Sequence, residues 1–102
     1  MAKLENKVIF DDELKGWWGE RYSNAIAVLM DTAPEGMTIG QMETRLGIIS
    51  RVKKVSEDSI IELDKNEIKM IIDDLDKAKF TKAKIEIVQF KKDLQESLEK
   101  AK

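Results

Sequence analysis

The chain contains no cysteine and no histidine. Without cysteine it has no disulfide framework and no thiolate nucleophile. Without histidine it lacks the commonest general base and the commonest ligand of zinc and copper. The sequence also contains no nucleophile elbow, phosphate-binding loop or dinucleotide fingerprint. We therefore expect no catalytic activity, no cofactor and no metal site.

Helix breakers and long apolar runs are scarce as well. Proline occurs once and glycine five times, whereas charged residues make up 37% of the chain, a composition that suits a mostly helical protein. No run approaches the roughly 20 apolar residues that cross a bilayer, and no long apolar segment near Met1 marks a signal peptide. We therefore expect a single helical domain over residues 1–102, located in the cytoplasm and without membrane contact.

The clearest local pattern lies between Ser59 and Phe80. A short apolar run at 59–63 predicts a strand. Asp64 follows, with Glu67 three residues later, and this pair is typical of a capping box at a helix N-terminus. The apolar residues that come next recur at the spacing of one helical face: Ile68, Ile71, Ile72 and Leu75.

The remaining pattern predicts a mainly α fold of four helices with a minimal two-stranded β-ribbon. A second apolar run, at 8–10, predicts the strand that pairs with 59–63, because a lone strand leaves its backbone groups unpaired. Residues 1–6 are polar, and we expect them to be frayed. Thr38 with Gln41 forms a second capping box. The four helices are predicted near residues 17–32, 39–54, 65–78 and 82–100, although the last two could also form one long bent helix.

Two apolar groups are candidates for protein contacts. Trp17, Trp18 and Tyr22 are a candidate partner surface, because aromatic side chains often anchor interfaces. The alternative is that one tryptophan lies in the core and its neighbour is half-exposed. The last helix carries a coiled-coil-like seam with further apolar residues beside it. This surplus predicts a homo-oligomer whose self-association residues are Ile85, Val88, Leu94 and Leu98.

The segment Glu35–Ile49 resembles the first part of a helix-turn-helix. In such DNA-binding domains the next helix enters the major groove. The basic side chains available for that role are Arg45, Arg51, Lys53 and Lys54. The residues that follow them are acidic, and the formal net charge is −2, so we expect nucleic acid not to be the partner. A second alternative is an oligomeric nucleotide-binding protein in which Trp and Arg stack on the ligand.

One longer pattern, I-x-L-x-x-x-E-x-x-x-I-x-x-x-L-x-K-A-x-F, is formed by Ile61, Leu63, Glu67, Ile71, Leu75, Lys77, Ala78 and Phe80. With the order of elements around it, this pattern resembles small uncharacterised α-helical proteins of tailed bacteriophages and prophages. The resemblance implies a phage-encoded factor in the host cytoplasm that acts by binding, either in particle assembly or on a host protein. Our expectation is therefore a self-associating, non-enzymatic protein–protein interaction factor.

Overall fold

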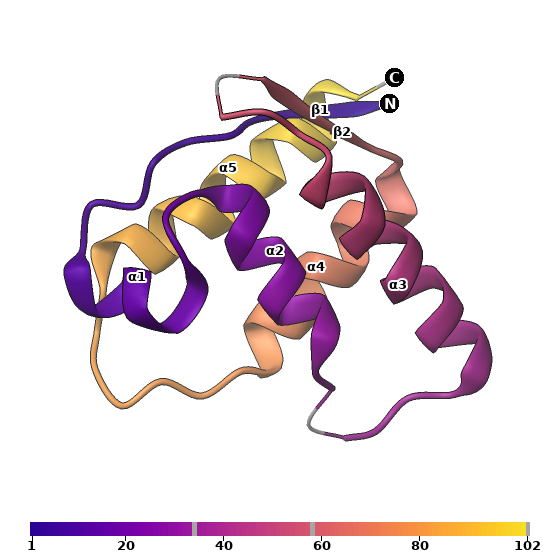
Figure 1. The fold of residues 1–102 in the computed structure, drawn as a ribbon, viewed down its shortest axis with the longest axis horizontal. Helices are drawn as coiled ribbons and strands as arrows, with labels where there is room; N and C mark the ends of the chain where they lie inside the picture. The colour runs from indigo at the N-terminus through magenta and orange to yellow at the C-terminus, as the bar shows by residue number, and fades with distance from the viewer. Residues whose placement is uncertain (34, 58, 102) are drawn as a thin grey trace.

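The computed structural model describes residues 1–33, 35–57 and 59–101. Five helices and one antiparallel pair of strands make up this part of the chain (Figure 1). In chain order the elements are β1 (Ala2–Glu5), α1 (Asp12–Trp18), α2 (Tyr22–Asp31), α3 (Ile39–Lys53), β2 (Ile60–Leu63), α4 (Lys65–Lys77) and α5 (Ile85–Lys100). The expected mainly α architecture with a two-stranded ribbon is confirmed, with five helices in place of four.

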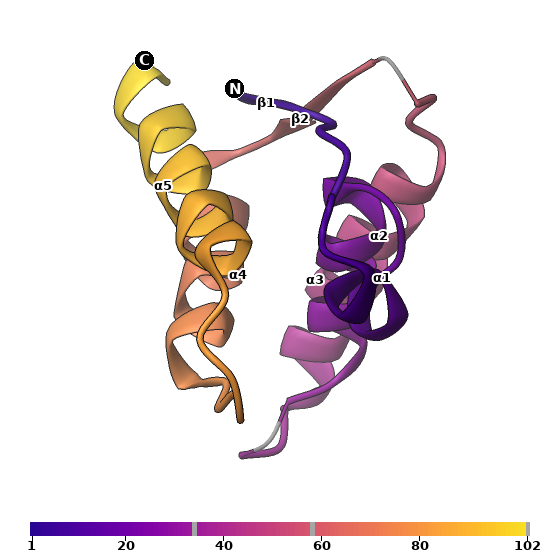
Figure 2. The ribbon, with the colours of Figure 1, turned by 90° about the vertical axis from the view of Figure 1, so that its left-hand side faces the viewer.

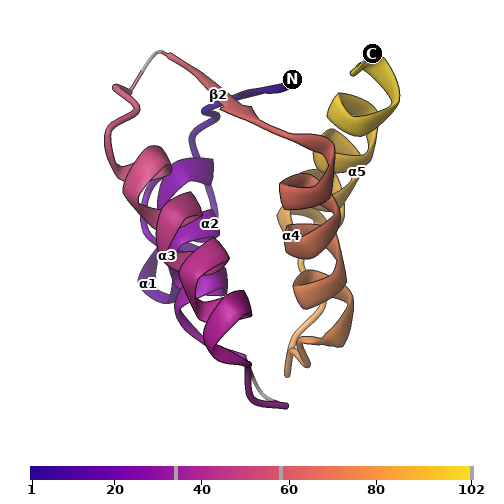
Figure 3. The same cartoon turned by 90° about the vertical axis from the view of Figure 1, so that its right-hand side faces the viewer.

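The helices form two layers, and the ribbon crosses above both (Figures 2 and 3). Helices α4 and α5 make one layer, and α1, α2 and α3 make the other. Contacts of α2 with α4, and of β1 with α5, join the layers. The core lies between them, and its largest fully buried side chains are Phe90, Leu14, Ile26, Met30, Ile48, Ile61, Leu63, Ile68, Ile71, Leu94 and Val52.

The unit from β2 to α4 follows the sequence pattern closely. The Asp64 carboxylate accepts a hydrogen bond of 2.8 Å from the Glu67 backbone N–H. The Glu67 carboxylate accepts one of 2.9 Å from the Asp64 backbone N–H, which completes the capping box. Ile68, Ile71 and Leu75 are buried, so the predicted apolar face does point into the core. The box of Thr38 and Gln41 likewise begins α3.

The strand predicted at 8–10 is wrong, and so is the expectation that residues 1–6 are frayed. The partner of β2 is β1, with Ala2 opposite Leu63 and Leu4 opposite Ile61. Ala2 and Leu4 are buried while Lys3 and Glu5 are exposed, which is the period-two pattern of a half-buried strand. Residues 8–10 instead lead into α1, and Val8 makes only an isolated bridge with Arg21.

The helix predicted at 17–32 is two helices. Asp11 caps α1 by accepting a hydrogen bond of 2.9 Å from the Leu14 backbone N–H, so the helix begins well before Trp17. Gly19 ends it with a φ of 97°, a value that favours glycine. Helix α2 then begins at Tyr22. The two tryptophans therefore belong to a different helix from Tyr22.

Helices α4 and α5 are separate, which decides between the two sequence alternatives. Ala78 adopts an extended conformation, with a ψ of 143°, and ends α4. Helix α5 begins at Ile85 rather than at residue 82. Among the described residues, no helix is long and apolar enough to cross a membrane.

Candidate interaction surface

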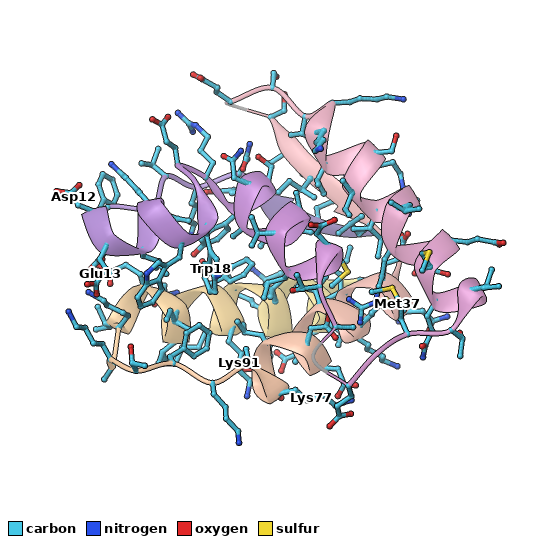
Figure 4. The ribbon with its side chains drawn as sticks, turned by 60° about the horizontal axis from the view of Figure 1, so that its bottom comes forward. Asp12, Glu13, Trp18, Met37, Lys77 and Lys91 are labelled. Carbon is cyan, nitrogen blue, oxygen red and sulfur yellow. The ribbon has the colours of Figure 1, made fainter. Side chains whose placement is uncertain are left out.

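Two of the three aromatic residues predicted as a partner surface lie in the core. Trp18 is 5% exposed, and Figure 4 shows it between α1 and α5. Its ring centroid lies 5.9 Å from that of Phe80 and 5.6 Å from that of Phe90. Tyr22 is also buried, with its ring 4.6 Å from Phe90. The three-residue surface is thus corrected to Trp17 alone, which is 38% exposed, as in the alternative of one core and one half-exposed tryptophan.

A buried polar cluster holds these aromatic rings in place. The Tyr22 hydroxyl donates a hydrogen bond of 2.7 Å to the Asp93 carboxylate, which also accepts one of 2.9 Å from Gln89 and one of 3.1 Å from Lys7. Burial, with the hydrogen bond to Asp93, strongly raises the pKa of Tyr22. Burial alone would raise the pKa of Asp93, but its three hydrogen bonds outweigh burial and lower it. The cluster therefore joins α2 and the segment after β1 to α5 through an ionised carboxylate.

Sequence reasoning missed Asp93 although a signal was present. Asp93 lies three residues after Phe90 and one before Leu94, at the spacing of one apolar face of the predicted last helix. A charged residue on that buried face requires partners, because an unpaired buried charge is costly. Its partners come from distant parts of the chain, so the sequence does not identify them.

Of the four self-association residues predicted on α5, two pack against the core and two are exposed. Leu94 is fully buried, so it is not available to a second copy, and Leu98 is partly buried against the core. Ile85 and Val88 remain on the surface, at 79% and 53% exposure. They lie beside the buried face of α5, which includes Phe90 and Leu94 and packs into the core.

The exposed residues of the two predicted groups are Trp17 on α1 and Ile85 and Val88 on α5, and Phe80 lies next to all three. Trp17 stacks on Phe80, with ring centroids 6.5 Å apart. Phe80, Ile85 and Val88 line one shallow hollow of about 580 Å³. We refer to Trp17, Phe80, Ile85 and Val88 as the Trp17–Val88 surface. The sequence analysis did not assign Phe80 to either candidate surface, because this residue lies beyond the last turn of the α4 stripe.

Ion pairs fix the segment that carries this surface. Lys84 contacts Asp11 at 2.9 Å and Glu13 at 3.1 Å, and Lys82 contacts Glu13 at 2.9 Å. Figure 4 shows Glu13 pointing from α1 toward this segment. The hydrogen bond from the Leu14 backbone N–H, followed by that from Lys84, lowers the pKa of Asp11. Hydrogen bonds from Lys82 and Lys84 lower the pKa of Glu13, so the segment is held against the start of α1 by ionised carboxylates.

The four basic residues considered for nucleic-acid binding do not form one free face. Arg45 is 8% exposed and donates hydrogen bonds of 2.5 and 2.8 Å to Asp74, with a third of 3.3 Å to the Thr32 carbonyl. The hydrogen bond to Asp74 raises the pKa of Arg45. Arg51 donates a hydrogen bond of 2.8 Å to Glu67. Both arginines therefore join α3 to α4.

Lys53 and Lys54 are exposed, as is Arg51, which is engaged by Glu67. They lie at the end of α3, and β2 is the next element among the described residues of this region. A second helix in the position of a recognition helix is not found in the described part of residues 54–60. The arrangement that a helix-turn-helix requires is therefore not formed here.

A larger hollow, of about 720 Å³, lies where the turn after α1 faces the end of α3. Its lining includes Trp17, Arg21 and Lys53. Arg21 donates hydrogen bonds to the backbone carbonyls of Asn6, at 3.2 Å, and Glu57, at 2.9 Å. The described residues contain no cluster of three or more acidic side chains arranged to hold a metal ion.

Comparison with known proteins found no matching protein-family model, no similar curated protein and no similar solved structure.

Proposed function

We propose that this protein is a non-enzymatic protein–protein interaction factor that binds a partner protein through the Trp17–Val88 surface. The observation that carries the proposal is the meeting of four large apolar side chains, from α1, the segment before α5 and α5 itself, on the outside of the molecule. Their exposed fractions correspond to roughly 400 Å² of apolar surface, which is as large as the largest patch on a typical monomer.

The chemistry of this surface suits a protein partner. Its centre is an aromatic pair, and aromatic side chains are enriched among the residues that carry binding energy. Lys82 and Lys84 line the same hollow and are engaged by Asp11 and Glu13, so these two charges are already paired. The sequence resemblance to small phage proteins supports a partner in an assembling phage particle or a host protein in the cytoplasm.

The test compares capture of a bacterial partner by wild-type protein and two variants. Ile85→Asp with Val88→Asp places charge on the Trp17–Val88 surface. Ile60→Asp is the matched control, because Ile60 is 46% exposed but lies on β2. We expect one partner to be retained by the wild type and by the control but lost from the double variant, with all three proteins equally folded by circular dichroism. Equal capture by the double variant would refute the surface, and absence of any partner would refute the function.

Small-ligand binding is a second candidate, supported by the hollow lined by Trp17, Arg21 and Lys53. An aromatic ring and cations on one hollow suit a planar anion such as a nucleotide. Stabilisation of the wild type by a nucleotide panel, lost in Trp17→Ala, would support it. No shift in melting temperature at millimolar nucleotide would exclude it.

A further inference from the structure

Residues 78–84, between α4 and α5, are not helical although their sequence favours a helix. Five of these seven residues are alanine or lysine, which are strong helix formers. Neither glycine nor proline occurs anywhere after Gly47. No side chain caps the start of α5, and α4 ends without a residue of positive φ. Local sequence therefore does not account for the break between the two helices.

A few side-chain contacts with α1 and its N-cap hold this segment, which we call the hinge, in its extended form. The contacts are those of Phe80 with Trp17 and Trp18, and of Lys82 and Lys84 with Asp11 and Glu13. The backbone N–H and C=O groups of residues 79–83 form no hydrogen bond with the described residues. Partly exposed ion pairs contribute little, so only a small free energy separates the extended hinge from a helical one.

A helical hinge would join two apolar faces that the extended hinge separates. Ile72 on α4 and Ile87 and Leu98 on α5 are partly buried against the core. With residues 78–84 helical, Phe80 and Ala83 lie in line between them. The positions of this continuous face then recur every three or four residues, as in a coiled coil: Ile72, Asp76, Phe80, Ala83, Ile87, Phe90, Leu94 and Leu98.

The resulting long helix is complementary to an antiparallel copy of itself. In the single chain, α4 runs away from the ribbon, α5 returns toward it, and Lys91 of α5 pairs with Asp76 of α4 (Figures 2 and 3). A two-fold axis between residues 83 and 84 makes Asp76 of one copy level with Lys91 of the other, so the same pair forms twice between copies. Residues 66–77 are then level with residues 90–101 of the other copy, so α4 again lies beside an α5 helix.

We propose that the hinge has two states, and that its helical state exchanges α5 between two copies of the chain. In the exchanged dimer, each α5 meets in the other copy the groups that it meets in the single chain, including Tyr22 through Asp93. Phe80 leaves Trp17 and Trp18 when the hinge becomes helical, so the exchange dismantles the Trp17–Val88 surface. The monomer is then the form that binds a partner. Only this last consequence rests on the proposed function, and the exchange can be tested without it.

The first experiment refolds the protein from urea at micromolar and at millimolar concentration and separates the products by size-exclusion chromatography with light scattering. Refolding is needed because α5, with the buried Phe90 and Leu94, must leave the core before it can exchange. We expect only monomer at micromolar concentration and an additional, slowly dissociating dimer at millimolar concentration. A chain that remains entirely monomeric at millimolar concentration would overturn the proposal.

Two variants should shift the dimer fraction in opposite directions. Ala83→Gly disfavours the helical hinge in both copies and should weaken dimerisation on the order of tenfold. Glu13→Gln removes a carboxylate that holds Lys82 and Lys84 in the extended form, so it should strengthen dimerisation several-fold. Asp12→Asn changes an exposed neighbour without an ion pair among the described residues and is the matched control. A general loss of stability would move both variants in the same direction, and that result would contradict the two-state hinge.

A crosslink distinguishes the exchanged dimer from an ordinary one. Lys3 on β1 and Glu96 on α5 line one small hollow, and the chain contains no cysteine. In Lys3→Cys with Glu96→Cys, a short bismaleimide should join the two positions within one chain of the monomer but between two chains of the exchanged dimer. On a denaturing gel the isolated dimer should therefore run at twice the chain mass, whereas both single-cysteine variants should run at the single mass. A dimer of the double variant that crosslinks only within each chain would refute the exchange.

Discussion

The hydrogen bond between Tyr22 and Asp93 makes a quantitative prediction about stability. Both groups are buried, and the bond is charge-assisted at 2.7 Å, so it should contribute about 1.5–3 kcal/mol. Tyr22→Phe removes only the hydroxyl and leaves the ring on Phe90. Gln89 and Lys7 continue to donate to Asp93 in that variant. We therefore expect Tyr22→Phe to lower the free energy of unfolding by about 2 kcal/mol.

A double-mutant cycle separates this bond from other effects of the substitutions. Asp93→Ala should cost about 3 kcal/mol, because it leaves the Tyr22 hydroxyl buried without its acceptor. The double variant should cost little more than Asp93→Ala, which gives a coupling energy of about 1.5–2 kcal/mol. Lys7→Ala is the control and should cost less than about 1 kcal/mol, because the Lys7 side chain is 44% exposed. The assay is urea unfolding followed by tryptophan fluorescence. A coupling energy below ~0.5 kcal/mol would refute the reasoning.

The same cluster should shape the pH dependence of stability. The pKa of Asp93 is lowered in the folded state, so its contribution is fully present above the ordinary carboxyl value of 3.8 and is lost as pH falls through the folded value. The pKa of Tyr22 is raised, so stability should also decline as pH rises above 10, where the unfolded chain ionises first. Tyr22 is the only tyrosine, so phenolate absorbance reports its titration alone. Titration of that absorbance near pH 10 in the folded protein would contradict the buried hydrogen bond.

Three further features of the structure are tested by substitution, each by urea unfolding. Arg45→Met should cost about 3–5 kcal/mol because it leaves Asp74 without its partner, whereas Arg45→Met with Asp74→Leu should cost far less. Gly47→Ala should stabilise the protein by about 1 kcal/mol, since an added Cβ meets no neighbouring atom. Gly19→Ala should destabilise it, because its Cβ would lie 2.5 Å from the Asn24 side chain. Asp64→Ala should cost about 1 kcal/mol through loss of the capping box, and an equal loss in Asp73→Ala, an exposed control, would argue against this cause.

Local chemistry made α4 and the start of α3 predictable. A capping box is formed by residues three positions apart, and one helical face repeats every three or four residues, so both signals lie within a short window. The period-two pattern of β1 was also present in Ala2 and Leu4, but only its pairing with β2 shows that this short run is a strand. Helix α1 ends where Gly19 adopts a positive φ. The presence of a glycine permits this conformation but does not show that the glycine adopts it.

The interaction surface was less predictable because it depends on which apolar residues the core excludes. Trp17 and Trp18 are neighbours of the same type, yet only Trp18 is buried, with its ring 5.6 Å from that of Phe90 on α5. On α3, Leu46 and Ile48 are equally apolar, and their difference in exposure follows from where α2 and α4 lie. A sequence pattern identifies an amphipathic helix, but when a helix has two apolar faces the tertiary packing determines which one is buried.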